Sequence, residues 1–131
     1  MNTLSAETKN TLADAARAAM EFSYSPYSNF KVGAALLGRS GKIYTGCNIE
    51  NSSFGATNCA ERTALFKAVS EGEKEFDAIA ITSSGDIATP PCGICCQALS
   101  EFAPKIKILL VTSKKIIETS LPEIFGMPFE L

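Results

Sequence analysis

FKVGAALLGRSGKIYTGCNIE, residues 30–50, holds two apolar segments separated by small and polar residues. The segments VGAALL and KIYTGC have the length and the β-branched, aliphatic and aromatic content typical of strands. Between them, Gly38 and Gly41 enclose a short polar run that favours a turn. The stretch therefore predicts two strands joined by a turn at residues 38–41.

Helices and further strands are predicted on both sides of this hairpin. Leu12, Ala15, Ala16 and Ala19 recur at helical spacing, which predicts a helix over residues 3–22. After the hairpin, the apolar spacing and the turn residues predict a loop at 51–58, a helix from 59 to a cap at Gly72, a strand at 76–84, a helix at 92–102, a strand at 106–113 and an irregular tail at 121–131.

The order of these elements determines the expected fold. It predicts an antiparallel hairpin followed by right-handed parallel crossovers, with helices covering a sheet. A length of 131 residues fits one domain, and no linker composition divides it. We therefore expect a single α/β domain over residues 1–131.

The bulk composition argues against two classes of partner. The formal net charge of −2 and the pI of about 5.2 lack the basic footprint of a nucleic-acid-binding protein. The first ten residues have no apolar core of a signal peptide, and the longest apolar runs are too short to cross a bilayer. We expect a cytoplasmic protein that binds neither nucleic acid nor membrane.

The cysteines indicate a metal site. The chain has five cysteines and no histidine, and an odd number argues against a closed disulfide framework. Cys92 and Cys95 stand three residues apart at a helix start, so both sulfurs can point the same way and hold two corners of a Zn²⁺ tetrahedron. A thioredoxin-like redox pair and simple burial remain alternatives at this point.

Cys59 is the best candidate for a third ligand. It opens another predicted helix, where backbone N–H groups and the helix dipole favour a thiolate. On a helix, Cys96 projects about 100° away from Cys95, and Cys47 at a strand end fits a buried small side chain better than a ligand. Three thiolates would leave one position of a zinc ion open, which is the arrangement of a catalytic site.

Two charged residues follow Cys59 directly along the chain. Glu61 diverges from the sulfur but could reach a water on the metal as a general base. Its alternative role is that of a first-turn acid that interacts with the helix dipole. Arg62 could donate hydrogen bonds to the thiolates and offset their negative charge, or it could be an ordinary solvent-exposed helix arginine.

The motifs CAER (residues 59–62) and PCGICCQ (91–97), preceded by GCNIEN (46–51), resemble the cytidine deaminase family, specifically its small homotetrameric type. The resemblance implies a three-layer αβα sandwich with a mixed sheet of about five strands. It also implies one Zn²⁺ per subunit and a homotetramer in which neighbouring subunits complete each site.

The resemblance further assigns roles to individual residues. By it, Cys59, Cys92 and Cys95 hold zinc and Glu61 shuttles protons. The substrate-binding residues would be Phe30 on the pyrimidine, the backbone of Ala60 on the base, Asn48 and Glu50 on the ribose hydroxyls, Phe54, and Phe125 lent by a neighbouring subunit. Two positions depart from the family pattern: Cys96 stands where arginine is common, and Phe54 stands where a tyrosine is frequent at the subunit contact.

The activity implied is hydrolytic deamination of cytidine and 2′-deoxycytidine, a reaction of pyrimidine salvage. One alternative is a deaminase of another cytosine compound such as blasticidin S, although those enzymes lack the NIEN residues 48–51. A nucleic-acid-editing deaminase is disfavoured by the acidic pI. A non-catalytic, zinc-stabilised binding module is the alternative from outside the enzymes.

Overall fold

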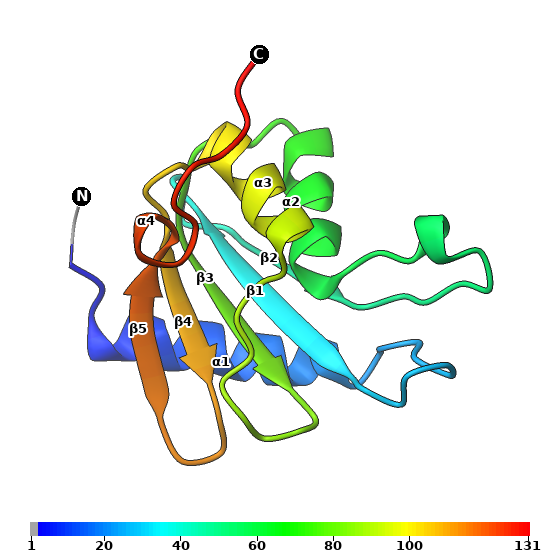
Figure 1. Ribbon diagram of the computed structural model, residues 1–131. Coiled ribbons are helices and arrows are strands. Elements are labelled where there is room, and N and C mark those ends of the chain that lie inside the picture. Colours follow the sequence, from blue (N-terminus) through cyan, green and yellow to red (C-terminus); the bar gives the residue numbers. More distant parts are fainter. Residues whose placement is uncertain (1–2) are drawn as a thin grey trace.

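The computed structural model describes residues 3–131. Along these residues, four α-helices and five strands follow one another (Figure 1): α1 (Ala6–Met20), β1 (Val32–Gly38), β2 (Ile43–Cys47), a 3₁₀ turn (Phe54–Ala56), α2 (Ala60–Ser70), β3 (Phe76–Ser83), α3 (Gly93–Phe102), β4 (Lys107–Val111), β5 (Ile116–Ser120) and α4 (Leu121–Ile124). None of the helices formed by these residues has the length and apolarity needed to span a bilayer.

The five strands form one mixed sheet in the order β2-β1-β3-β4-β5. The predicted hairpin is present, with β1 and β2 antiparallel, and β3 pairs with β1 on its other side. β3 and β4 are parallel, as the α3 crossover between them requires. The fifth strand, β5, pairs antiparallel with β4 at the edge of the sheet, where the sequence analysis had located no strand.

Helices cover both faces of this sheet, which confirms the three-layer αβα sandwich (Figure 1). Along β3 the side chains alternate between the two layers: Ile79 and Ile81 pack toward α2 and α3, whereas Ala78 and Ala80 pack toward α1. The larger of the two apolar cores lies beneath α2 and α3. Its fully buried aliphatic side chains on the strands and helices include Leu36, Leu65, Ile79, Ile81, Leu99, Ile108 and Leu121.

Helix α2 lies unusually close to the sheet at Gly46 of β2. A Cβ atom at this position would stand 2.5 Å from the backbone oxygen of Ala60 and 2.5 Å from the backbone nitrogen of Ala64. Only glycine therefore permits this approach. The contact fixes the first turn of α2, which begins directly after Cys59, against the strand that ends at Cys47.

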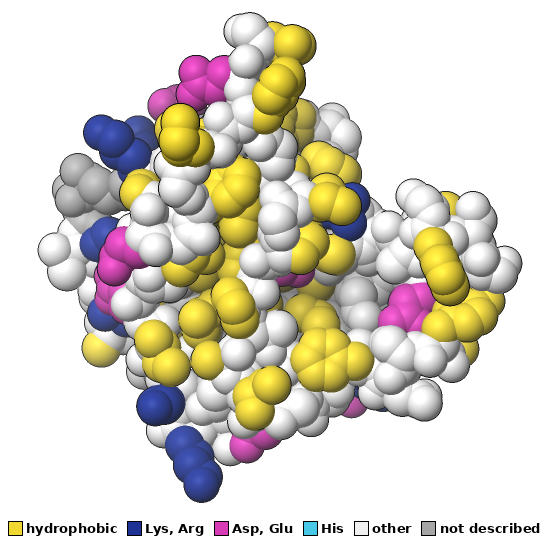
Figure 2. All heavy atoms as spheres, viewed as in Figure 1, with side chains coloured by type: hydrophobic (Ala, Val, Ile, Leu, Met, Phe, Trp, Pro, Cys, Tyr) yellow, Lys and Arg dark blue, Asp and Glu magenta, His cyan; other side chains and the backbone are white. Residues whose placement is uncertain are grey.

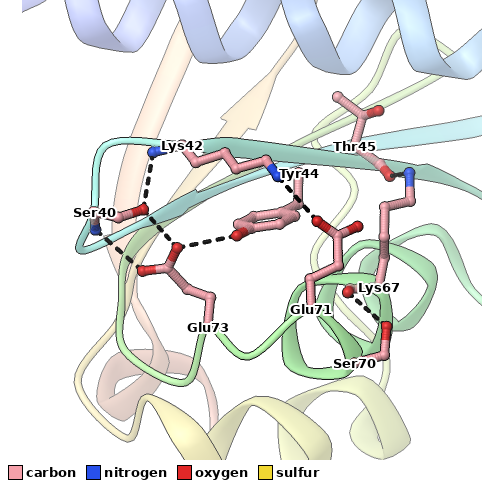
Figure 3. A network of polar contacts seen from close by, with 8 residues as sticks. All are labelled: Ser40, Lys42, Tyr44, Thr45, Lys67, Ser70, Glu71 and Glu73. Atoms are coloured by element: carbon pink, nitrogen blue, oxygen red, sulfur yellow. Dashed lines mark hydrogen bonds and ion pairs between the residues drawn. The ribbon is translucent and has the colours of Figure 1, made fainter.

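At the opposite end of α2, a polar network joins the hairpin turn to the α2–β3 connection (Figure 3). The Glu73 carboxylate accepts hydrogen bonds from the Ser40 backbone N–H (3.1 Å), the Ser40 hydroxyl (2.5 Å) and the Tyr44 hydroxyl (3.0 Å). Lys42 forms an ion pair with Glu71 at 2.9 Å. The hydrogen bonds from Ser40 hold the pKa of the Glu73 carboxyl below its usual value.

Replacing Glu73 with Gln should destabilise the fold in a pH-dependent way. In the variant, the amide NH₂ group would face a hydrogen-bond donor, such as the Ser40 N–H, from which a carboxylate oxygen now accepts. Because that hydrogen bond would be lost, the melting temperature of Glu73→Gln should fall at pH 7. Because the carboxyl pKa is depressed in the folded state, its stabilising effect is present above the unfolded pKa near 4.5 and is lost as the pH falls below it. The difference in melting temperature from wild type should therefore shrink at low pH, as measured by circular dichroism.

Glu75→Gln is the matched control, because the Glu75 carboxylate lies 3.7 Å from Arg39 in an exposed contact. A Glu73→Gln protein whose melting temperature equals that of the control at every pH would contradict this role of the network.

Candidate metal centre

Three cysteine sulfurs meet at the N-terminal ends of α2 and α3. The Sγ atoms of Cys59, Cys92 and Cys95 all lie within 4.8 Å of one another, and those of Cys59 and Cys92 are 3.9 Å apart. In a tetrahedral site with Zn–S bonds of about 2.3 Å, two sulfurs stand roughly 3.8 Å apart. The thiol cluster therefore fits Zn²⁺ and confirms the zinc prediction.

Helix capping places these sulfurs. Cys59 is the N-cap residue of α2, and Cys92 is the N-cap residue of α3. The Sγ atom of Cys92 accepts a hydrogen bond from the Cys95 backbone N–H at 3.5 Å, in the manner of a capping side chain. Both helix N-termini present partial positive charge to the cluster, which favours thiolates.

The other two cysteines do not belong to the cluster. Cys96 is buried beneath the start of α3, and its thiol donates to the backbone oxygen of Pro91 at 3.6 Å. Burial raises the pKa of both the Cys96 and the Cys47 thiols, as expected for uncharged side chains. On helix α3 the side chains of Cys95 and Cys96 therefore point in different directions, as the sequence predicts for adjacent helical residues.

Arg62 supplies positive charge beside the sulfurs. Its Nη2 donates to the Sγ atom of Cys59 at 3.3 Å, while its buried Nε finds no hydrogen-bond acceptor among residues 3–131. A hydrogen bond from the Cys95 thiol, together with the hydrogen bond and the positive charge of Arg62, lowers the pKa of the Cys59 thiol to about 5. The guanidinium thus stabilises negative charge on a sulfur.

Glu61 is buried in the first turn of α2 and lines the cleft next to the sulfurs. Burial is the main reason that its pKa rises to about 7. A carboxyl group in this environment can exist in both protonation states near neutral pH, which is what a residue that accepts and returns a proton requires.

A cleft of about 290 Å³ opens beside the cluster. Phe30, Val32, Asn48 and Glu50 are among the residues that line it. Six lining residues were not predicted from the sequence, namely Ser28, Val32, Thr57, Asn58, Thr89 and Pro90. Each stands close in sequence to a motif residue, but nothing in its type indicates a binding site. The volume suits a small molecule rather than a polymer.

Asn48 and Glu50 are fixed by hydrogen bonds yet keep unused capacity. Nδ2 of Asn48 donates to the backbone oxygen of Phe30 at 2.8 Å, and Oδ1 accepts from the backbone N–H of Val32 at 2.9 Å. Oε1 of Glu50 accepts from the backbone N–H groups of Tyr27 and Ser28, and Oε2 accepts from the Ser28 hydroxyl. One N–H of Asn48 and one lone pair of Glu50 therefore remain for a ligand.

Phe54 and Phe125 do not reach this cleft in a single chain. Phe54 is 83% exposed and lines a neighbouring groove of about 240 Å³, which shares Glu50 with the cleft. Phe125 follows α4 and packs, half-buried, against the larger core. Within one chain, neither aromatic ring contributes to the wall of the cleft.

Among zinc enzymes, three protein thiolates and a glutamate that is not a ligand are found in the hydrolytic nucleobase deaminases. Residues 6–111 match the profile of the cytidine and deoxycytidylate deaminase zinc-binding region. The chain therefore belongs to the cytidine and deoxycytidylate deaminase family.

Individual relatives agree with this assignment. A cytidine deaminase of Sporosarcina psychrophila is 47% identical over 113 residues, which cover 85% of this chain and 83% of that protein. The crystal structure of a cytidine deaminase from Burkholderia pseudomallei superposes with a TM-score of 0.86 at 43% identity, over 92% of this chain and 98% of that one. A blasticidin-S deaminase of Bacillus cereus is 31% identical over 106 residues, 75% of this chain and 76% of that protein.

Removing a ligand sulfur should remove the metal. Cys59→Ala and Cys92→Ala should each lower zinc affinity by more than the 10- to 100-fold typical of a lost supporting contact to a ligand. After dialysis against a weak chelator, mass spectrometry should find the metal depleted in these variants.

Cys96→Ala is the matched control, since this thiol lies outside the cluster but on the same helix. It should retain as much zinc as the wild type. Equal zinc loss from Cys96→Ala and Cys59→Ala would contradict the three-sulfur site.

Proposed function

We propose that the chain catalyses hydrolytic deamination of cytidine and 2′-deoxycytidine, giving uridine or 2′-deoxyuridine and ammonia. The observation that carries this proposal is the meeting of the Cys59–Cys92–Cys95 cluster with the buried Glu61 on one small-molecule cleft. When bound, Zn²⁺ would supply an activated water as the nucleophile for the ring carbon that bears the amino group.

Glu61 moves the protons of this reaction. It takes a proton from the attacking water and delivers it to N3 of the pyrimidine; once the water oxygen has bonded to the ring carbon, Glu61 takes the remaining proton of that oxygen and gives it to the amino group, which leaves as ammonia. Its place two residues after Cys59 on the first turn of α2 supports this role, because the carboxyl faces the cleft without replacing a sulfur as ligand.

Arg62 compensates charge in the same site. Three thiolates around Zn²⁺ carry a net charge of −1, which opposes ionisation of the nucleophilic water. The hydrogen bond from Arg62 to Cys59 draws negative charge toward the guanidinium and away from the water.

The remaining cleft residues hold the nucleoside. Phe30 packs on the pyrimidine, the backbone of Ala60 contacts the base, and Asn48 and Glu50 hydrogen-bond the ribose hydroxyls. Among the described residues, no Lys or Arg lines the cleft, and the Glu50 carboxylate would repel a phosphate. This electrostatic environment favours uncharged nucleosides over nucleotides.

The protein also assembles, in this proposal, into a cytoplasmic homotetramer in which Phe54 and Phe125 reach the cleft of a neighbouring subunit. Two loop segments, residues 21–31 before β1 and residues 48–59 after β2, carry exposed aromatic rings, which support an interface there: Phe22, Tyr24, Tyr27 and Phe54. Figure 2 shows apolar side chains on the projecting lobe that the loop after β2 forms. Exposed apolar side chains gathered on one lobe are typical of a contact surface.

Glu61→Gln should separate catalysis from zinc binding. The amide keeps the size of the side chain but cannot carry the proton, so kcat on cytidine should fall by at least the roughly 10²- to 10⁴-fold that general acid–base catalysis contributes. Zinc content and melting temperature should stay close to those of the wild type. Turnover is followed by the loss of cytidine absorbance.

The same assay discriminates between the alternatives. Cytidine, free cytosine and blasticidin S are compared as substrates of the wild type, and turnover of blasticidin S without turnover of cytidine would overturn the proposed substrate. A zinc-loaded, folded wild type with no turnover of any of the three would favour the non-catalytic binding module.

Subunit complementation tests the shared site. Phe125→Ala should lower activity because each cleft would lack the ring lent by a neighbour, and Glu61→Gln should be inactive for its own reason. In co-expressed mixed oligomers, a Phe125→Ala subunit receives an intact Phe125 from a Glu61→Gln neighbour, so activity should recover above that of either variant alone. No recovery in verified mixed tetramers would contradict the role of Phe125.

A further inference from the structure

The connection from β3 to α3, residues 84–91, carries part of the cleft wall without any regular structure of its own. Thr89 and Pro90 line the cleft, and the connection ends at the metal-binding Cys92. The Thr89 hydroxyl donates to the backbone oxygen of Ile87 at 2.9 Å and also bonds the hydroxyl of Ser83, the last residue of β3, at 2.8 Å. These bonds tie Thr89 to the end of β3 but leave the middle of the connection, residues 84–88, to be positioned by other contacts.

On its inner side the connection supports the aromatic wall. The Ser84 backbone N–H donates to the backbone oxygen of Lys31 at 2.8 Å, and the Lys31 N–H donates to the Ser84 hydroxyl at 3.0 Å. Gly85 lies directly against the ring of Phe30, since a Cβ at this position would stand 3.0 Å from Phe30 Cε1. The position of Gly85 therefore limits where the Phe30 ring can lie.

On its outer side the connection is held by Asp86. The Asp86 carboxylate accepts from the backbone N–H of Ser113 at 2.7 Å and from the Ser113 hydroxyl at 2.6 Å, across 27 residues of sequence. Asp86 adopts a left-handed backbone conformation with φ of 53°, which few side chains tolerate. The two hydrogen bonds tie the connection to the β4–β5 turn, which contains Ser113.

That turn is itself anchored. Thr112 closes it through its backbone N–H, which donates to the backbone oxygen of Lys115 at 2.9 Å. From α1, Nη2 of Arg17 donates to the backbone oxygen of Thr112 at 3.1 Å. A continuous series of hydrogen bonds thus runs from α1 through the turn to Asp86, the residue next to Gly85.

We infer that Asp86 is a positioning residue for the nucleoside. Its contact with Ser113 holds Gly85 against Phe30 and holds Thr89 and Pro90 at the cleft wall, so that the base binds between the Phe30 ring and these two residues. This inference rests on the proposed function. Because helices α2 and α3 place Glu61 and the three sulfurs, the contact acts on substrate binding more than on the chemical step.

Asp86→Gly is the decisive variant, because glycine adopts the left-handed conformation without strain and only the carboxylate is lost. We expect KM for cytidine to rise by roughly an order of magnitude, within the about 100-fold that a misplaced group can cost, with kcat nearly unchanged. Zinc content should also be unchanged. Asp86→Asn should restore KM, since its amide oxygen can accept from the Ser113 N–H and its NH₂ can donate to the Ser113 hydroxyl.

Glu101→Gln, which removes one exposed negative charge on α3, is the charge control and should leave KM unaltered. Amide hydrogen exchange provides a second readout that does not depend on turnover: the Ser113 N–H should be protected in the wild type and in Asp86→Asn but not in Asp86→Gly.

An unchanged KM in Asp86→Gly, or a fall in kcat with loss of zinc instead of the rise in KM, would overturn the inference while leaving the proposed function in place. An unprotected Ser113 N–H in the wild type would also overturn it. A wild type that protects Ser113 but never turns over cytidine would instead overturn the proposed function, and the substrate role of Asp86 with it.

Discussion

The arrangement of the whole site depends on two helix N-termini meeting at one point. Two of the three sulfurs are N-cap residues, and the third lies in the first turn of α3, so their separation follows directly from how α2 and α3 lie on the sheet. A shift of one helix by a fraction of a turn would break the tetrahedral spacing. The close contact between Gly46 and the first turn of α2 is one device that prevents such a shift.

The same helix entrance also separates the roles of its charged residues. At the start of α2, the Cys59 sulfur belongs to the thiol cluster, Glu61 lines the cleft, and Nη2 of Arg62 donates to the Cys59 sulfur at 3.3 Å. Burial raises the pKa of the Glu61 carboxyl, whereas hydrogen bonds lower that of the Cys59 thiol. Neighbouring residues therefore acquire opposite protonation preferences from one structural element, which explains why CAER is so compact a motif.

Sequence patterns predicted the parts of this molecule in which side-chain periodicity reflects burial. The hairpin and the three longer helices follow from apolar spacing, because each packs a defined face on the sheet. β5 escaped prediction because IIETS at the sheet edge is only partly buried and has no clear alternation. Thr89 and Pro90 escaped because their place in the cleft results from long-range contacts, such as that between Asp86 and Ser113, which no local pattern records.

The departure at Cys96 follows a consistent electrostatic logic. At this position, where the family commonly has arginine, the chain has a buried thiol that donates to the backbone of Pro91. A guanidinium in the same enclosed space would need an anionic partner or a route to solvent. Without it, the positive potential at the sulfurs comes from Arg62 and the two helix N-termini. Because helix dipoles are fixed by the fold, charge compensation at the sulfurs rests on one side chain, Arg62, and otherwise on backbone geometry.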